Sequence, residues 1–208
     1  MPGPLARSGD VVVPLRVPRA ELAPVSRIRS TLLLSSTQSL KTHGHYERYV
    51  AALDPEASVT LAELVAGVWI PLRVAEAHYL ACEALHLPYD EQAALGQDVN
   101  DRVQGSVLGV SARAARSVGA TPWTVLTQTP RLWDRVFEGG GGVEVRQTGP
   151  KDAVVEMVGL ALLDIPYFRH GFRGAFLSGL GLFCRRAYVT VVDEGRADMS
   201  ASYDISWA

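Results

Sequence analysis

Residues 132–158 read LWDRVFEGGGGVEVRQTGPKDAVVEMV, and the periodicity of the chain changes within this stretch. Before the four glycines, apolar residues recur every three or four positions, as on one face of a helix. After them, Val143 and Val145 alternate with charged residues, a Gly149-Pro150 turn follows, and residues 154–158 return as a second apolar run. This pattern predicts an antiparallel hairpin. The glycines therefore separate a helical N-terminal half from a half that contains strands.

The segment before the glycine run predicts a series of helices bounded by proline and glycine, which commonly begin or end them. Apolar stripes at a spacing of three or four are typical of helices with one buried face. The expected helices run from about Ile28 to Leu53 with a break near Gly44, from Trp69 to Leu87, from Asp90 to Gly119, and from Thr121 to Phe137 with a kink or restart at Pro130.

The segment after the first hairpin predicts one helix and a second hairpin. The helix begins at Ile165-Pro166 and extends to about Phe183. The hairpin runs out over 188–192, turns around Gly195 and returns over 203–207, where apolar and polar residues alternate. Helices followed by the order β-β-α-β-β predict an α+β fold, in which N-terminal helices pack on a four-stranded antiparallel sheet.

The first 25 residues differ from the rest because they contain five prolines. Each proline fixes φ and removes a backbone donor, which excludes a long helix or a central strand. We therefore expect residues 1–25 to be a disordered, proline-rich lead, with docking of Val11–Val13 as an edge strand as the alternative. Residues 26–208 are expected to form a single α+β domain, since 208 residues suffice for one core.

Composition excludes several partner classes. Twenty basic and 22 acidic residues give a formal charge of −2, which offers no general field for nucleic acid or an anionic membrane. No apolar run is long enough to span a bilayer or to act as a signal peptide, so we expect a cytoplasmic protein. Cys82 and Cys184 are far apart in sequence and predict neither a disulfide framework nor a four-thiolate zinc site.

The order of elements resembles a fold shared by 4-vinyl-reductase-type ligand-binding domains, haem-NO-binding domains and TRAPP tethering-complex subunits of the Bet3 type. The glycine-bearing stretch 172–180, followed by a strand pair, is similar to a helix of the vinyl-reductase-type domains. A closer resemblance is to an uncharacterised family of similar length found in myxobacteria, and it covers residues 26–208. The motifs that carry it are residues 69–72 (WIPL), 77–79 (AHY), 101–105 (DRVQG), 121–123 (TPW) and 182–184 (LFC).

Haem is the first cofactor that this resemblance raises. One branch of the fold binds haem through a histidine on a helix and holds its propionates with a Tyr-x-Ser-x-Arg motif. The nearest string here, Tyr203-Asp204-Ile205-Ser206-Trp207, has no arginine in the required place. His78 could be a ligand, but a histidine bonded to a neighbouring group is far more common. Haem is therefore not expected, and the cofactor is left unknown.

Metal and thiol chemistry rest on few residues. His78 and Cys82 lie four apart on one helical face, and His43 and His45 form a His-x-His pair. Two such pairs do not make a zinc site, which needs three or four ligands, so no metal is expected. By resemblance, the Bet3-type subunits carry an acylated cysteine near an apolar tunnel. A packed, inert thiol is the other interpretation of Cys82.

Motifs for catalysis are missing from the sequence. It contains no Gly-x-Ser-x-Gly, no His-Glu-x-x-His and no phosphate-binding Gly-x-x-x-x-Gly-Lys-Ser/Thr. The spacing of Asp98 and Arg102 fits a surface ion pair. We therefore expect a protein that is not an enzyme.

A set of aromatic residues carries the strongest functional signal. They belong to segments that should face the interior, where they either line an apolar pocket between helices and sheet or fill the core. The pocket candidates are Trp69, Tyr79, Trp123, Trp133, Phe168, Phe172 and Phe176.

The helix that begins at Pro166 carries a face of small residues: Gly171, Gly174, Ser178 and Gly181. Each glycine costs a helix about 1 kcal/mol relative to alanine, which indicates that another backbone must approach closely. Packing of this face on the protein's own sheet and a symmetric dimer contact are the two interpretations.

Together these patterns favour a non-enzymatic, small-molecule-binding or sensory module with an apolar pocket between helices and sheet. The alternative is a protein-interaction or scaffold subunit with a filled core. A homodimer or protein partner is possible in either case. A pocket of roughly 300 Å³ or more would favour the first function.

Overall fold

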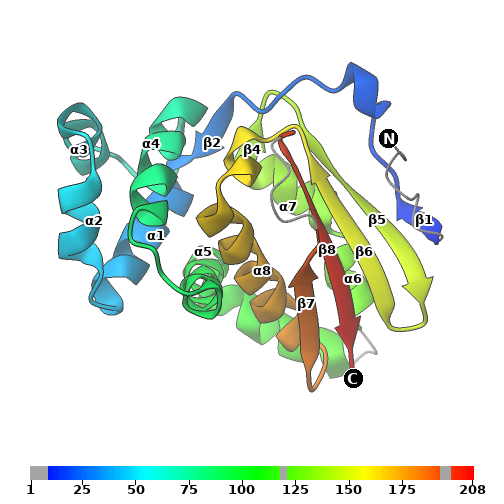
Figure 1. Ribbon diagram of the computed structural model, residues 1–208. Helices are drawn as coiled ribbons and strands as arrows, with labels where there is room; N and C mark the ends of the chain where they lie inside the picture. The colour runs from blue at the N-terminus through cyan, green and yellow to red at the C-terminus, as the bar shows by residue number, and fades with distance from the viewer. Residues whose placement is uncertain (1–8, 118–120, 193–197) are drawn as a thin grey trace.

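A computed structural model gives the fold and describes residues 9–117, 121–192 and 198–208; within 104–117 it describes the backbone only. The main sheet has five antiparallel strands in the order β1-β5-β6-β8-β7 (Figure 1). Both predicted hairpins are present, and they meet where β6 pairs with β8, with Val155 opposite Tyr203. The strands are β1 (Asp10–Val13), β5 (Gly142–Gly149), β6 (Asp152–Val158), β7 (Ala187–Val191) and β8 (Ser200–Trp207).

The N-terminal segment corrects the expectation of a disordered lead and a four-stranded sheet. Strand β1 pairs with β5, placing Asp10 opposite Gln147, so the valines occupy the open edge of the sheet. The short 3-10 helix η1 (Arg19–Glu21) follows, and the amide of Val25 donates to the carbonyl of Gly159 over 2.8 Å. The segment 9–25 is therefore part of the fold, because β1 pairs with β5 and residues 23 and 25 form backbone hydrogen bonds with Gly141 and Gly159. Residues 1–8 of the expected lead lie outside the described residues.

The helices follow the predicted order, with two differences, each at a helix start that contains a proline: Pro71 before α4 and Pro55 at the first position of α3. Trp69–Pro71 forms β3, which pairs with β2 (Arg27–Arg29), and β2 also pairs with β4 (Phe137–Glu138), so Pro71 precedes the helix instead of lying within it. Asp54 accepts hydrogen bonds from two amides and begins an unpredicted helix. The helices are α1 (Ser30–Thr42), α2 (Tyr46–Ala52), α3 (Pro55–Ala62), α4 (Leu72–Glu83), α5 (Tyr89–Ser117), α6 (Pro122–Leu126), α7 (Thr129–Val136) and α8 (Pro166–Gly181), with the 3-10 helix η2 (Ala161–Asp164) before α8.

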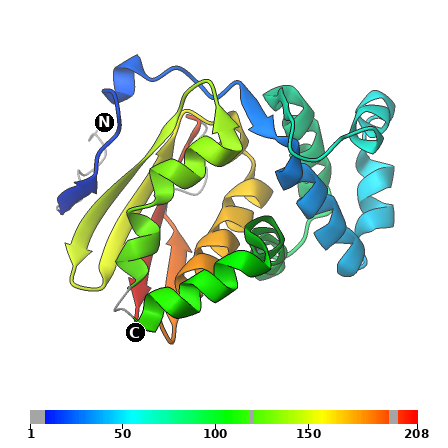
Figure 2. The same ribbon diagram turned by 180° about the vertical axis from the view of Figure 1, so that it is seen from behind.

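The helices form two groups on either side of the long helix α5. Helices α6, α7 and α8 cover one face of the sheet, while α1 to α4 form a separate group beyond α5 (Figures 1 and 2). Helix α8 packs against both α5 and β7, and α7 packs against β5. None of the helices within the described residues combines the length and the apolar character needed to cross a bilayer.

The closest contact of the small-residue face of α8 is with helix α5 and not with the sheet. A Cβ atom at Gly174 would lie 1.9 Å from the carbonyl oxygen of Ala93, and one at Gly96 would lie 2.0 Å from that of Gly171. Ser178 accepts a hydrogen bond from Asn100 over 2.9 Å and donates one to Asp101. Added Cβ atoms at Gly171 and Gly181 would meet open space. The backbones of α5 and α8 therefore touch at two glycines, one on each helix.

Candidate functional site

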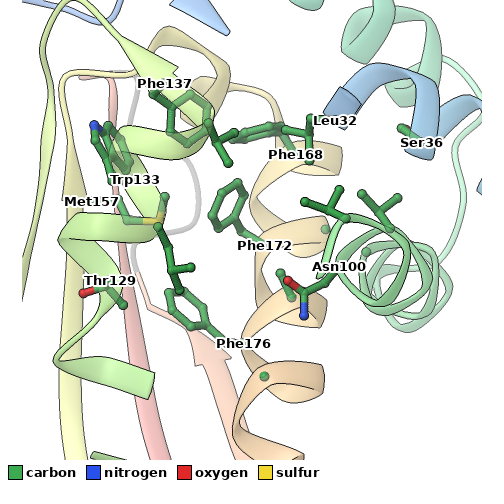
Figure 3. A pocket seen from close by; sticks show the side chains of 18 of the residues that line it. Leu32, Ser36, Asn100, Thr129, Trp133, Phe137, Met157, Phe168, Phe172 and Phe176 are labelled. Atoms are coloured by element: carbon green, nitrogen blue, oxygen red, sulfur yellow. The ribbon is translucent and has the colours of Figure 1, made fainter. Parts of the chain in front are cut away.

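A cavity of about 230 Å³ lies between α5, α7, α8 and the sheet (Figure 3). It extends past α5 to α1 and α4. Most of its walls are aliphatic or aromatic, and Arg135 is the charged member among the described lining residues. The lining consists of Leu32, Ser36, Tyr79, Leu95, Gly96, Val99, Asn100, Val103, Val125, Thr129, Leu132, Trp133, Arg135, Val136, Phe137, Val143, Met157, Tyr167, Phe168, Gly171, Phe172, Ala175, Phe176 and Gly179.

Three phenylalanines of α8 form one wall. Phe168, Phe172 and Phe176 are four residues apart, so they project from one face of the helix. Their ring centroids are 5.0 and 6.3 Å apart in sequence order. Figure 3 shows Phe172 pointing into the middle of the cavity, with Met157 and Trp133 on the opposite side. A flat apolar ligand would therefore contact rings on one side and the sheet on the other.

The polar groups near this wall are already bonded within the protein. The indole of Trp133 donates to the carbonyl of Gly140 over 3.1 Å, and the hydroxyl of Thr129 donates to that of Leu126 over 2.7 Å. Arg135 lies on the exposed side of α7, where the cavity meets solvent. These bonds leave the middle of the cavity apolar, which favours an apolar ligand.

The end of the cavity formed by α1 and α4 has a polar character. Ser36 lines it, and the Oγ of Ser36 lies 2.9 Å from Nε2 of His78. The other ring nitrogen of His78, Nδ1, lies 2.6 Å from the hydroxyl oxygen of Tyr49. His78 is fully buried, and burial lowers its pKa to about 3. Its imidazole is therefore neutral at ordinary pH, with both ring nitrogens engaged by hydroxyls.

Cys82 lies behind this network, with its sulfur 3.7 Å from Nε2 of His78. Burial is the main cause that raises the pKa of the Cys82 thiol, and the side chain of Tyr167 is a hydrogen-bonding neighbour. A buried thiol with a raised pKa has little of the thiolate that acylation or metal binding requires. This environment favours the packed-thiol interpretation.

The two members of the other histidine pair lie in different environments. His45 pairs with Glu91 over 2.8 Å, and His43 is exposed. Within the described ranges, no group of three or more histidine, cysteine or acidic side chains is arranged to hold a metal ion.

Five of the seven aromatic pocket candidates line the cavity: Tyr79, Trp133, Phe168, Phe172 and Phe176. Trp69 and Trp123 lie elsewhere. Trp69 is in β3, where the guanidinium of Arg29 stacks 3.9 Å from its ring, and Trp123 donates to the carbonyl of Pro150 and packs against Trp207. Sequence reasoning missed Ser36 and Asn100, because a serine or asparagine within a helical stripe carries no signal of facing a cavity.

Comparison with solved structures gives matches along most of the chain. One is the Fe(II) unliganded H-NOX protein from K. algicida, with a TM-score of 0.59 and 7% identity over 86% of this chain and 96% of that one. An oxygen-binding H-NOX domain related to soluble guanylate cyclases matches at 0.56 and 10% identity, over 86% and 94%. A structure from a study of haem distortion in the H-NOX family matches at 0.56 and 11%, over the same shares.

The fold is that of the H-NOX domains. No family model matches the sequence, and no curated protein does. Of the resemblances expected from the sequence, the one to haem-NO-binding domains therefore holds for the fold, while the one to a myxobacterial family has no support.

The expectation about haem needs correction. Haem was not expected because the Tyr-x-Ser-x-Arg motif is missing, yet the matching structures are H-NOX domains, two of them from studies of haem itself. The expectation rested on one short motif, whereas the fold is shared at 7 to 11% sequence identity.

The cavity lining supplies residue types that a haem would need. Methionine ligates haem iron in proteins, and Met157 lines the cavity. Tyr79 and Tyr167 also line it, but burial raises the pKa of both hydroxyls, which disfavours the tyrosinate that would bind iron. Arg135 at the exposed side is placed to pair with a carboxylate. His78 offers no free ring nitrogen, since Tyr49 and Ser36 occupy both. The volume of 230 Å³ lies below the range of about 300–1,000 Å³ usual for drug-sized ligands, so a porphyrin would require α7 and α8 to separate.

Proposed function

We propose that this chain is a small-molecule-binding sensory module, without catalysis of its own, whose ligand occupies the cavity between α5, α7, α8 and the sheet. The observation that carries the proposal is the cavity itself. It is walled by Phe168, Phe172, Phe176, Met157 and Trp133 and is almost free of unbonded polar groups. A core that was simply filled would leave no such space, because protein interiors normally pack to crystal-like density.

Cavity size narrows the ligand class. The volume of about 230 Å³ falls short of the roughly 300 Å³ that was expected to favour a ligand-binding function and at which pockets for drug-sized ligands begin, so the proposal is limited to smaller ligands. A one-ring aromatic or a short branched aliphatic molecule fits without rearrangement. Haem supplies an iron that binds diatomic gases, and it belongs to the same proposal only if α7 and α8 separate to admit it.

Signalling in this proposal would arise from helix α7. Thr129, Leu132, Trp133 and Val136 of α7 line the cavity, while Asp134 on the outer side accepts a 2.9 Å hydrogen bond from Arg16. A ligand that pushes α7 outward would therefore change the surface at the N-terminal segment. Dimerisation and a protein partner stay predictions.

The first experiment is native mass spectrometry of protein purified from its own cells, beside a denatured sample and an absorbance scan. We expect a non-covalent mass that is lost on denaturation. A Soret band in the scan, or after titration with hemin, would identify haem as the ligand. A clean apo mass together with no hemin uptake would count against the proposal and favour the scaffold alternative.

A cavity-filling variant tests whether the ligand occupies this cavity, and a second glycine of the same helix provides the matched control. Gly171 lines the cavity, and an added Cβ there has nothing within 4 Å, so Gly171→Leu should fold and fill the space. Gly181→Leu makes the same change on the exposed end of α8. The bound mass should disappear in Gly171→Leu and persist in Gly181→Leu. Retention of the ligand by both variants would place it outside this cavity.

A further inference from the structure

The Ser36–His78–Tyr49 chain joins three helices at the α1 and α4 end of the cavity. Ser36 comes from α1, Tyr49 from α2 and His78 from α4. All three side chains are at most 2% exposed. Of the three, Ser36 alone lines the cavity, so it is the member that a ligand can touch.

The tautomer of His78 sets the order of donors along this chain of side chains. Burial raises the pKa of the Tyr49 hydroxyl, so it keeps its proton and has one hydrogen bond to donate. With the ring proton of His78 on Nε2, the hydroxyl of Tyr49 donates to Nδ1 over 2.6 Å. Nε2 then donates to the oxygen of Ser36 over 2.9 Å. The proton of the Ser36 hydroxyl is thereby free to point into the cavity.

Charge is missing from this end of the cavity. The imidazole of His78 is neutral. The other described lining residues from α1, α4 and α5 are uncharged: Leu32, Tyr79, Leu95, Gly96, Val99, Asn100 and Val103. A carboxylate or ammonium group placed there would lose its hydration without a counter-ion. A neutral acceptor, by contrast, would gain a hydrogen bond polarised by the two bonds behind it.

We propose that Ser36 is the specificity-determining residue of the cavity, and that it donates a hydrogen bond to a neutral carbonyl or ether oxygen on an otherwise apolar ligand. This inference rests on the proposed function, since it names the chemical class of the ligand of the same cavity. His78 and Tyr49 are positioning residues, which hold the Ser36 oxygen as an acceptor so that its proton is available.

The test uses two probes of equal shape, acetophenone and α-methylstyrene. They differ in one group, because the carbonyl oxygen of the first is replaced by a methylene in the second. Dissociation constants for both are measured by calorimetry on wild type and on Ser36→Ala. A neutral hydrogen bond contributes about 0.5–1.5 kcal/mol, so the preference for acetophenone should fall by roughly two- to tenfold in Ser36→Ala.

Two further variants separate recognition from structural support. Tyr49→Phe removes the donor to Nδ1, which allows the Ser36 proton to turn toward His78, and it should lower the preference for acetophenone in the same direction. Ser39→Ala is the matched control, because Ser39 is also fully buried on α1 but donates to the carbonyl of Leu95 and does not line the cavity. It should leave the ratio of the two constants unchanged.

The outcomes are distinguishable. Binding of both probes with a ratio that Ser36→Ala does not change would overturn the role of Ser36 and leave the proposed function standing. An equal fall in the ratio for Ser39→Ala would assign the effect to helix α1 as a whole and would also overturn it. Binding of neither probe to wild type would refute the inference together with the small-ligand form of the proposed function.

Discussion

The contact between α5 and α8 makes a sharp prediction about Gly174. Replacing Gly174 by alanine would add a Cβ atom 1.9 Å from the carbonyl oxygen of Ala93, 2.8 Å from its carbon and 2.9 Å from the amide nitrogen of Gln97. These neighbours are backbone atoms of a long helix, so no side chain can rotate away. The two helices would have to separate by more than about 1 Å, an order-of-magnitude figure set by ordinary van der Waals contact at about 3.5 Å.

The expected cost combines two opposing effects. Alanine is favoured over glycine within a helix by about 1 kcal/mol. Overpacking a well-packed interface costs about 1–3 kcal/mol or more, and this contact is at the severe end because it involves backbone on both sides. Separating the helices would also loosen the hydrogen bond between Asn100 and Ser178. We expect Gly174→Ala to lower the free energy of unfolding by roughly 2 kcal/mol.

Urea denaturation followed by far-UV circular dichroism measures this change, and the same helix offers a control. An added Cβ at Gly181 has nothing within 4 Å, so Gly181→Ala carries the propensity gain without the clash. It should be as stable as wild type or slightly more stable. If Gly174→Ala and Gly181→Ala unfold at the same urea concentration, the close approach of α5 and α8 is wrong.

Two other predictions concern the helices beyond α5. The pKa of His78 is lowered to about 3 in the fold. Between pH 7 and pH 5 the unfolded chain therefore binds a proton that the folded chain excludes, and the free energy of unfolding decreases as the pH is lowered. This group accounts for about 2 kcal/mol of that loss, so His78→Gln should show a correspondingly flatter stability profile in urea titrations; parallel profiles would contradict it. Asp54→Ala removes the cap of α3 and should cost about 1 kcal/mol, measured by thermal unfolding, whereas Asp54→Asn should retain most of that stability. Equal losses for the two Asp54 variants would count against the capping role.

The second half of the fold was predictable because its signals are local. Alternation in 143–145 and 203–207 indicates strands, and the two strands of each hairpin are near in sequence. The class and the order of elements therefore followed from periodicity alone.

The missed elements depend on partners that are distant in sequence. Strand β1 forms because β5, more than a hundred residues later, leaves its outer edge open, and proline counting cannot reveal that edge. Asp54-Pro55 indicates a turn as readily as a capped helix, and no residue of α3 is fully buried to mark it as a helix in the sequence.

The site was predictable only in part, for the same reason. Phe168, Phe172 and Phe176 share one helix face, so their common direction follows from spacing. Ser36 and His78 are separated by 42 positions and Tyr49 and His78 by 29, and no spacing rule joins them. The position of Trp123 depends on Trp207 at the end of the chain.

The N-terminal segment adds a second connection between helix α7 and the sheet, which also pack directly against each other. It is held at one end by the pairing of β1 with β5, and Arg16 attaches it to Asp134 of α7. Further along, Arg19 pairs with Glu156 and Asp198 at the sheet. Helix α7 is thus linked to the edge of the sheet through the N-terminal segment. An outward movement of α7 would break the ion pair between Arg16 and Asp134 or detach β1 from β5.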